Sequence, residues 1–245
     1  MNLINLTETP STNTWLKENC ATLPHGTVAI THNQTAGRGQ RGNSWEAEPG
    51  KNLTFSILLR PDALHPAQQF VISEIVSLAI IDKLRRRLAP EIDGNRIKIK
   101  WPNDIYVDDR KIAGILIEHS ICSTAIQHTI AGIGLNVNQM EFRSDAPNPT
   151  SMAILARHEF NLDTLLGEIV APIVAPLSPA MHSAIHSRYL ENLWRADGAM
   201  HRFTRPDGTG FEAAIADVAS DGFLTLRLAD GTTERFAFKE VAFVL

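Results

Sequence analysis

The sequence predicts an α+β protein, with a mixed sheet flanked by helices and a small antiparallel β-barrel at its C-terminal end. Two observations indicate this class. Up to about residue 197, strand-like runs alternate with segments whose apolar residues recur at helical spacing. After Gly198 there are only short alternating runs, separated by turn sequences such as Asp230-Gly231. We therefore expect one domain over residues 1–197 and a smaller one over residues 198–245.

The individual elements follow from local patterns. Ser11 is a candidate N-cap for a helix over residues 12–20, and Pro66 suits the first turn of a long amphipathic helix over residues 66–88. Two further helices are expected between residues 162 and 194, interrupted near residues 172–179. Strands are expected at residues 3–6, 27–32, 53–59 and 96–100, and as an antiparallel pair at 112–118 and 124–137. The barrel strands are expected at residues 210–218, 223–228, 232–238 and 241–245.

Composition and charge are those of an ordinary globular protein. The chain has 245 residues, of which 44% are hydrophobic and 20% charged, and its formal net charge is −4. This charge gives no indication of nucleic acid or an anionic membrane as a partner. The sequence shows neither a signal peptide nor a run of about 18 apolar residues, and its two cysteines lack disulfide or zinc spacing. We expect a cytoplasmic protein that binds no DNA and no membrane.

The most informative segment is residues 35–45, TAGRGQRGNSW, in which three glycines and two arginines fall within six residues. Glycine lets backbone N–H groups approach a ligand closely, and arginine offers permanently charged donors that match phosphate or carboxylate oxygens. The segment lacks the spacing of a P-loop or of a dinucleotide-binding turn. Taken alone, it is equally consistent with an anion-binding loop and with a glycine-rich surface hairpin.

Three other segments carry candidate chemistry. Residues 100–104 (KWPND) place Lys100 at a strand end, where a fixed positive charge can stabilise developing negative charge, although a plain turn explains the rest. Residues 11–13 (STN) offer more polar groups than capping needs, so they can also bind a neutral polar ligand. Residues 132–138 (GIGLNVN) pair two glycines with the amide of Asn136, which favours close approach of a flat ligand.

These four motifs, in this order, resemble the motif set of the biotin–protein ligases, and the chain is similar to a bacterial member. The resemblance extends over roughly residues 5–138, and Glu74, Gly114 and the segment GILIE (114–118) also lie where that family keeps equivalents. It implies a class II synthetase-like catalytic domain with a small SH3-like β-barrel after it. It also implies that biotin and ATP form biotinyl-5′-AMP, and that biotin then passes to a lysine of an acceptor protein.

The resemblance also implies roles for particular residues. Arg38 and Lys100 would be catalytic. The biotin site would contain Ser11, Thr12, Asn13, Gln34, Arg38, Gly39, Gln40, Lys100 and Gly114. The nucleotide site would contain Arg38, Arg41, Trp45, Asn103 and Asn136. Trp45 is either an anchor for the end of the loop or a plain core residue.

The loop departs from the commonest pattern of the family, GRGRxGR. Gln40 and Asn43 stand where basic residues are usual, so phosphate contacts would depend on Arg38, Arg41 and Lys100. Magnesium is implied as the partner of ATP, but the sequence contains no carboxylate cluster that fixes its ligands, and Asp104 is the one candidate. No metal site of the protein itself is expected.

Some alternatives stay open. A lipoate–protein ligase shares the catalytic fold, and a sensor that binds a vitamin or nucleotide without turnover would keep the pocket. Regulatory members carry a DNA-binding domain before the STN motif. Only ten residues precede Ser11 here, so we expect the monofunctional enzyme. The expected partner is the biotin carboxyl carrier domain of acetyl-CoA carboxylase or of a related carboxylase. Either a monomer or a homodimer is compatible with the sequence.

Overall fold

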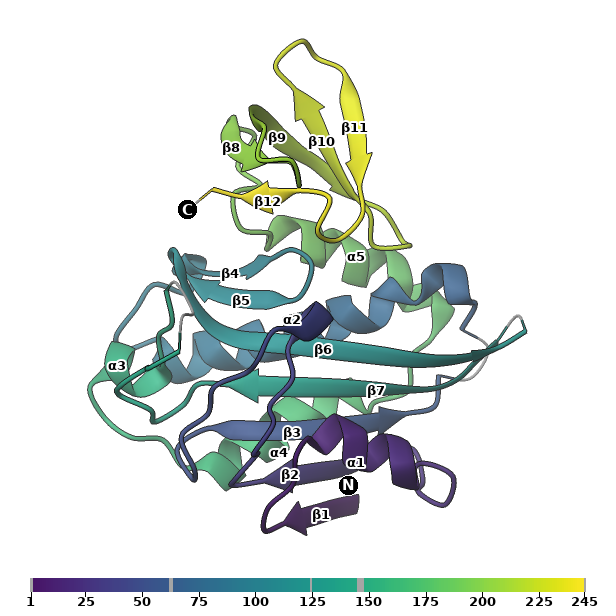
Figure 1. Cartoon of the computed structure of the whole chain (residues 1–245), viewed down its shortest axis with the longest axis vertical. Coiled ribbons are helices and arrows are strands. Elements are labelled where there is room, and N and C mark those ends of the chain that lie inside the picture. The colour runs from purple at the N-terminus through teal and green to yellow at the C-terminus, as the bar shows by residue number, and fades with distance from the viewer. Residues whose placement is uncertain (1, 62–63, 124, 145–147, 245) are drawn as a thin grey trace.

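The computed structural model describes residues 2–61, 64–123, 125–144 and 148–244, without the side chain of Arg41. Over these residues the chain forms a layered α+β body with a second, smaller sheet at one end (Figure 1). In the same ranges no helix is long and apolar enough to cross a membrane.

The main sheet has seven strands within the described ranges, in the order β1-β2-β3-β7-β6-β5-β4. Only β1 and β2 pair in parallel among these neighbours, so the sheet is mixed. The strands are β1 (Asn2–Leu6), β2 (Thr27–Thr31), β3 (Leu53–Leu59), β4 (Ile97–Lys100), β5 (Asp104–Val107), β6 (Arg110–Cys122) and β7 (Ala125–Leu135).

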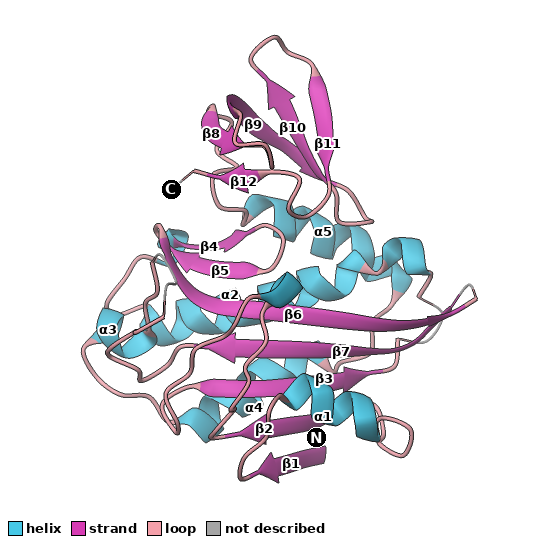
Figure 2. Ribbon diagram, in the orientation of Figure 1, coloured by secondary structure: helices cyan, strands magenta, loops and turns pink. Residues whose placement is uncertain are grey.

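Helices cover both faces of this sheet (Figure 2). On one face, α1 (Thr12–Asn19) packs on β3 and β7, and its Leu16 shares a small buried cluster with Ala29 and Leu58. The other face is covered by α2 (Phe70–Leu88), against which α4 (Leu162–Ile173) and α5 (His182–Glu191) pack. A short helix, α3 (Met152–Ala156), follows the loop after β7. Because side chains alternate along a strand, neighbouring residues of β2 enter different clusters, Val28 in the main core and Ala29 under α1.

The C-terminal segment forms a five-stranded antiparallel sheet in the order β11-β10-β9-β8-β12. Its strands are β8 (His201–Thr204), β9 (Gly210–Val218), β10 (Leu224–Leu228), β11 (Thr233–Phe236) and β12 (Ala242–Phe243). No ladder joins β11 to β12 over the described residues, so the sheet is open there. The predicted small antiparallel sheet is therefore confirmed, whereas its closure into a barrel is not.

Most elements lie where the sequence predicts them. The strand over residues 53–59 is confirmed at both ends, and the Ser11 hydroxyl accepts the N–H of Thr14 as an N-cap does. The start predicted for the long helix was wrong, because Pro66 begins a separate 3₁₀ turn and α2 starts at Phe70. The sequence did not predict β5, β8 or α3, which have four or five residues each and show no clear alternation or helical spacing of apolar residues.

A buried acid links the body to the small sheet. Glu74 of α2 is 2% exposed, and its Oε1 lies 2.7 Å from Nδ1 of His186 in α5. Nε2 of the same histidine lies 3.8 Å from Oδ1 of Asp217 in β9. Burial raises the pKa of Glu74 above its ordinary value, although the hydrogen bond and charge of His186 lower it in part. The ionised carboxylate is thus less stable in the fold than in water.

We expect Glu74→Gln to stabilise the protein at pH 8. A carboxyl group with a raised pKa in the fold contributes its stability fully below the unfolded pKa, and loses it as pH rises through the folded value. Glutamine keeps the shape of the side chain but does not ionise, so the variant does not lose this stability as pH rises. Thermal melts should show Tm higher by roughly 2–4 °C at pH 8, with little change at pH 4, where the wild-type carboxyl is already protonated. Equal shifts at the two pH values would contradict this account.

Candidate active site

A cleft of about 1160 Å³ opens on the face of the main sheet that carries α1. Its walls come from the start of α1, the loop of residues 35–45, the β4–β5 turn, the first half of β6, the end of β7 and the end of the small sheet. The structure brings almost all of the predicted site residues to this cleft: Ser11, Thr12, Asn13, Gln34, Arg38, Gly39, Gln40, Trp45, Lys100, Asn103, Gly114 and Asn136. The side chain of Arg41 lies outside the described part of the structure.

Hydrogen bonds hold the polar start of α1 against the sheet. The backbone N–H of Thr12 donates to Gln34 Oε1 at 2.9 Å. Asn13 Nδ2 donates to the carbonyl of Leu116 at 3.2 Å and to Glu118 Oε2 at 2.7 Å. Thr12 and Asn13 are both 3% exposed. Their polar atoms are therefore fixed in direction before any ligand arrives.

Glycines form the floor of the cleft. Gly114 of β6 and Gly134 of β7 are direct cross-strand partners, and the indole of Trp45 lies against both. A Cβ atom on Gly114 would come within 2.9 Å of Trp45 Cζ3, and one on Gly134 within 2.7 Å of Trp45 Cζ2. Trp45 therefore packs on the glycine pair, as an anchor for the end of the loop would, rather than in the main core.

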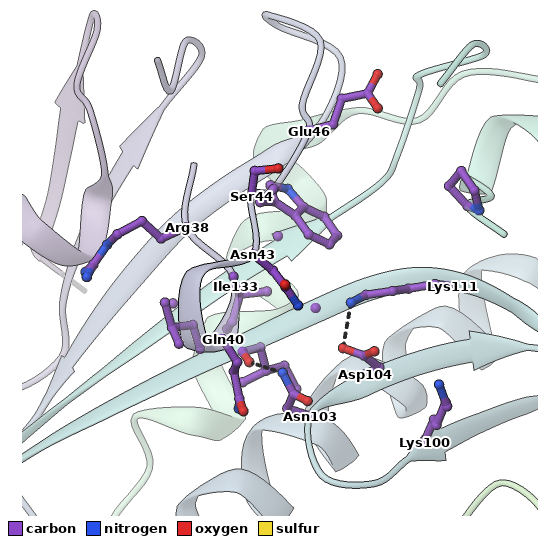
Figure 3. Close-up of a pocket in the computed structure, with 18 of the residues that line it drawn as sticks. Arg38, Gln40, Asn43, Ser44, Glu46, Lys100, Asn103, Asp104, Lys111 and Ile133 are labelled. Atoms are coloured by element: carbon purple, nitrogen blue, oxygen red, sulfur yellow. Dashed lines mark hydrogen bonds and ion pairs between the residues drawn. The ribbon is translucent and has the colours of Figure 1, made fainter. Parts of the chain in front are cut away.

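The glycine-rich loop forms a compact hairpin. The N–H of Gly39 donates to the carbonyl of Asn43 at 2.6 Å, and that of Trp45 donates to Gly37 at 2.9 Å. Arg38 Nη2 lies 3.0 Å from Glu118 Oε2, and the guanidinium points away from Lys100 and Lys111 (Figure 3). Arg38 is thus held by a carboxylate in this structure.

Two lysines converge on the cleft. Lys100 Nζ donates to Tyr106 Oη at 3.1 Å and lies 4.8 to 5.8 Å from the ring centres of Tyr106, Trp194 and Phe243. Over the described residues it forms no ion pair. Burial lowers the pKa of Lys100, and the nearby cations Lys111 and Arg195 lower it further, against the opposite effect of Asp104. A half-buried ammonium without a counter-ion favours an anionic ligand.

The second lysine, Lys111, was missed by the sequence analysis. It lies in β6, its Nζ is 2.7 Å from Asp104 Oδ1 and 5.5 Å from the centre of the Trp45 ring. Figure 3 shows Lys111 and Asp104 facing each other, with Lys100 directed toward the same region. The one signal in the sequence was its place directly before the strand predicted at residues 112–118 and three residues before Gly114.

The small sheet also contributes to the cleft, through Phe238, Lys239 and Phe243. Contacts with the body hold it there: Trp101 Nε1 donates to the carbonyl of Gly222 at 2.9 Å, and the Trp194 and Phe243 rings lie 5.4 Å apart. These residues are more than a hundred positions from the motifs near the N-terminus, and no local pattern marked them.

Two buried polar atoms at the cleft have no protein partner among the described residues, Asn136 Oδ1 and Trp45 Nε1. The amide nitrogen of Asn136 donates to the carbonyl of Thr150 at 3.0 Å, which fixes the orientation of the side chain. An unpaired buried acceptor is costly, so a ligand N–H group that met Asn136 Oδ1 would be bound favourably.

The described residues contain no group of three or more His, Cys, Asp or Glu side chains that could hold a metal ion. The acid nearest the two lysines, Asp104, already pairs with Lys111. These described side chains do not form a metal site of their own.

The cleft thus combines fixed hydrogen-bonding groups, a glycine floor and two ammonium groups, an arrangement that can hold a ligand with both polar and anionic groups. Residues 3–136, more than half of the chain, match the biotin/lipoate A/B protein ligase family. The chain therefore belongs to that family.

Individual curated relatives match this chain over about half of its length. The biotin–[acetyl-CoA-carboxylase] ligase of Paracoccus denitrificans is 36% identical over 134 residues, which are 54% of this chain and 53% of that protein. The bifunctional ligase/repressor BirA of Escherichia coli (strain K12) is 33% identical over 127 residues, 52% of this chain and 38% of that protein. The chain thus spans about half, or less, of the length of these relatives.

Among solved structures, the biotin protein ligase from Aquifex aeolicus in complex with biotin and ATP superposes with a TM-score of 0.79 at 23% identity. The alignment covers 98% of this chain and 97% of that one. The predicted mixed sheet with flanking helices is therefore confirmed as the fold of the biotin protein ligases, including a small C-terminal sheet.

Proposed function

We propose that this protein is an ATP-dependent ligase that activates biotin as biotinyl-5′-AMP and transfers it to a specific lysine of a biotin carboxyl carrier domain. The observation that carries the proposal is the joining, in one cleft, of a rigid polar site at Thr12 and Asn13 with two lysines and the unpaired amide oxygen of Asn136. Biotin would lie at Thr12 and Asn13, the transferred phosphate at the two lysines, and adenine at Asn136.

The reaction has two steps. A carboxylate oxygen of biotin attacks the α-phosphorus of ATP, and the bond to the β-phosphate oxygen breaks, so that pyrophosphate leaves. The neutral amine of the acceptor lysine then attacks the activated carbonyl, AMP leaves, and the nitrogen loses a proton. Since the nucleophiles are biotin and the acceptor, the enzyme supplies positioning and charge.

The two lysines suit the first step. Negative charge grows on the oxygens around phosphorus in the transition state, and fixed cations in a partly buried site stabilise it. Lys100 would contact the carboxylate and the α-phosphate. Lys111 would act beside it by exchanging Asp104 for a phosphate oxygen, and Arg38 would leave Glu118 to join them. Magnesium would enter with ATP, held by the phosphates.

Asn136 and Trp45 would contact the nucleotide. Asn136 Oδ1 can accept a hydrogen bond from the exocyclic amine of adenine, and the Trp45 indole offers a flat surface for the base. Asn103 is held by its hydrogen bond to the carbonyl of Ile115, at 2.8 Å, at the turn after Lys100. The acceptor domain would approach the carbonyl from the open side of the cleft.

We further propose a division into a catalytic domain (residues 1–197) and an SH3-like domain (residues 198–245). The two hydrogen-bonded sheets support it, because every strand of the first ends by residue 135 and every strand of the second starts after residue 200.

Transfer of radiolabelled biotin tests the proposed function. The purified chain, with MgATP and a biotin carboxyl carrier domain, should label the carrier, and omission of ATP or of the carrier should abolish labelling. Radiolabelled lipoate in place of biotin is the control for substrate class. Transfer of lipoate but not of biotin, or binding of biotin without transfer, would overturn the proposal.

We expect residues 35–45 to resist proteolysis better when biotin and ATP are both present. The loop would close over the adenylate, and a closed loop exposes fewer cleavable bonds. Trypsin should cleave after Arg38 or Arg41 more slowly in the complex, with cleavage after Arg157, which is exposed at the end of α3 and does not line the cleft, as an internal reference. The same cleavage rate with and without ligands would contradict this expectation.

A further inference from the structure

Behind the start of α1 lies a buried hydroxyl group that the mechanism above does not use. Ser56 of β3 is fully buried. Its Oγ lies 2.5 Å from Asn13 Oδ1 and 2.7 Å from Thr12 Oγ1. It therefore touches both of the side chains that begin the polar site.

The neighbours of Asn13 decide which of these atoms carries each proton. Asn13 Nδ2 faces two acceptors, the carbonyl of Leu116 and the carboxylate of Glu118, so Oδ1 is the atom that faces Ser56. A carbonyl oxygen can only accept. The single proton of Ser56 is therefore donated to Asn13.

This assignment also determines the direction of the hydroxyl proton of Thr12. With its proton given to Asn13, Ser56 Oγ can only accept from Thr12, so the proton of Thr12 Oγ1 points at Ser56. Because the one hydroxyl proton of Thr12 then points at Ser56 at 2.7 Å, the longer 3.4 Å approach of Thr12 Oγ1 to Gln34 Oε1 is a contact between two oxygen acceptors. Thr12, which lines the cleft, offers only lone pairs to a ligand.

We infer that Ser56 is a positioning residue that makes Thr12 an obligate hydrogen-bond acceptor and thereby selects a ligand head group bearing an N–H donor. The inference rests on the proposed function and deepens it: the ureido ring of biotin carries such N–H groups, whereas the dithiolane ring of lipoate carries none. Lipoate would leave the Thr12 lone pairs unpaired in a buried site, which is the strongest basis for rejecting a ligand.

Ser56→Ala removes this control without touching the ligand. Thr12 would then rotate freely and Asn13 Oδ1 would lose its donor. We expect the Kd and KM for biotin to rise about tenfold, with the KM for ATP and kcat at saturating biotin within about twofold of wild type. Desthiobiotin, which keeps both ureido N–H groups, should lose affinity by the same factor. Ser56→Cys, with a weak S–H donor, should fall between Ser56→Ala and wild type.

Ser77→Ala is the matched control, because Ser77 is also fully buried but its Oγ has no partner among the described residues. It should leave biotin binding unchanged. Calorimetric titration of biotin, with circular dichroism melts to verify folding, measures all variants. Unchanged biotin affinity in folded Ser56→Ala would overturn the inference, as would equal rises in the KM for biotin and ATP. Failure of the wild-type chain to transfer biotin, despite normal biotin binding, would instead count against the proposed function alone.

Discussion

Replacement of Lys100 by alanine should lower the rate of pyrophosphate release by about 10²–10³-fold, as expected when one fixed donor to a transition-state anion is lost. Lys100 lies at the end of β4 among three aromatic rings and forms no ion pair over the described residues. Its charge would therefore be available to the phosphate of ATP under the proposed function. Lys111→Ala should have a comparable effect, and the double variant should lose less than the product of the two, because the lysines would act on one group.

The fold should survive replacement of Lys100. Loss of the hydrogen bond to Tyr106 and of the contacts with aromatic rings should cost about 1 kcal/mol or less. Lys98→Ala is the matched control, because Lys98 lies on the same strand, two residues earlier, and its Nζ approaches the carbonyl of Glu191 at 3.4 Å. Single-turnover pyrophosphate release and thermal melts measure these effects. Wild-type release by folded Lys100→Ala would refute its catalytic role.

Gly132→Ala should weaken biotin binding by about 100-fold, which corresponds to about 2.7 kcal/mol. Gly132 lies on β7 directly beneath Asn13, and a Cβ atom there would come within 2.8 Å of Asn13 Cγ and overlap Oδ1. Asn13 cannot yield easily, since hydrogen bonds to Leu116, Glu118 and Ser56 hold it. The methyl group would therefore displace the head-group site, and overpacking should cost about 1–3 kcal/mol of stability.

Gly167→Ala provides the contrast within the same chain. Gly167 lies in α4, and a Cβ atom there would meet nothing within 4 Å. Alanine should stabilise that helix by up to about 1 kcal/mol and leave biotin binding unchanged. Titration of biotin and thermal melts on both variants test the difference. Gly132→Ala with wild-type biotin affinity would show that Asn13 does not need its present position.

Local patterns were sufficient for several parts of the structure. The β3 strand and the Ser11 cap depend on neighbours in sequence, and both lie where the sequence predicted them. The strand start at Arg96 was less accurate, because Arg96 ends a 3₁₀ turn whose Asp93 cap lies outside the alternating run. Short elements such as β5 depend on pairing with β4 and β6, and a four-residue run carries little periodic signal.

The residues of the candidate site likewise fall into those that the sequence identified and those that it missed. Residues within the four motifs could be named, because each motif brings its own turn, cap or glycine pair. Lys111 and Ser56 were not named, since a place beside or within a predicted strand does not distinguish them from ordinary strand residues, and Glu118 was noted only as part of the segment GILIE. Glu118 became part of the site only through Asn13 and Arg38, which are 105 and 80 positions away. Phe243 became part of it through packing of the small sheet against Trp194.

By itself, the sequence determined the class of fold, the order of the motifs and the side chains that begin the site, because those depend on local propensity and hydrophobic spacing. Only the tertiary structure decided which of those side chains are donors and which are acceptors. A hydroxyl such as that of Thr12 can take either role, and the choice passes from Glu118 through Asn13 and Ser56, which lie on three separate elements. Hydrogen-bond direction depends on neighbours in space.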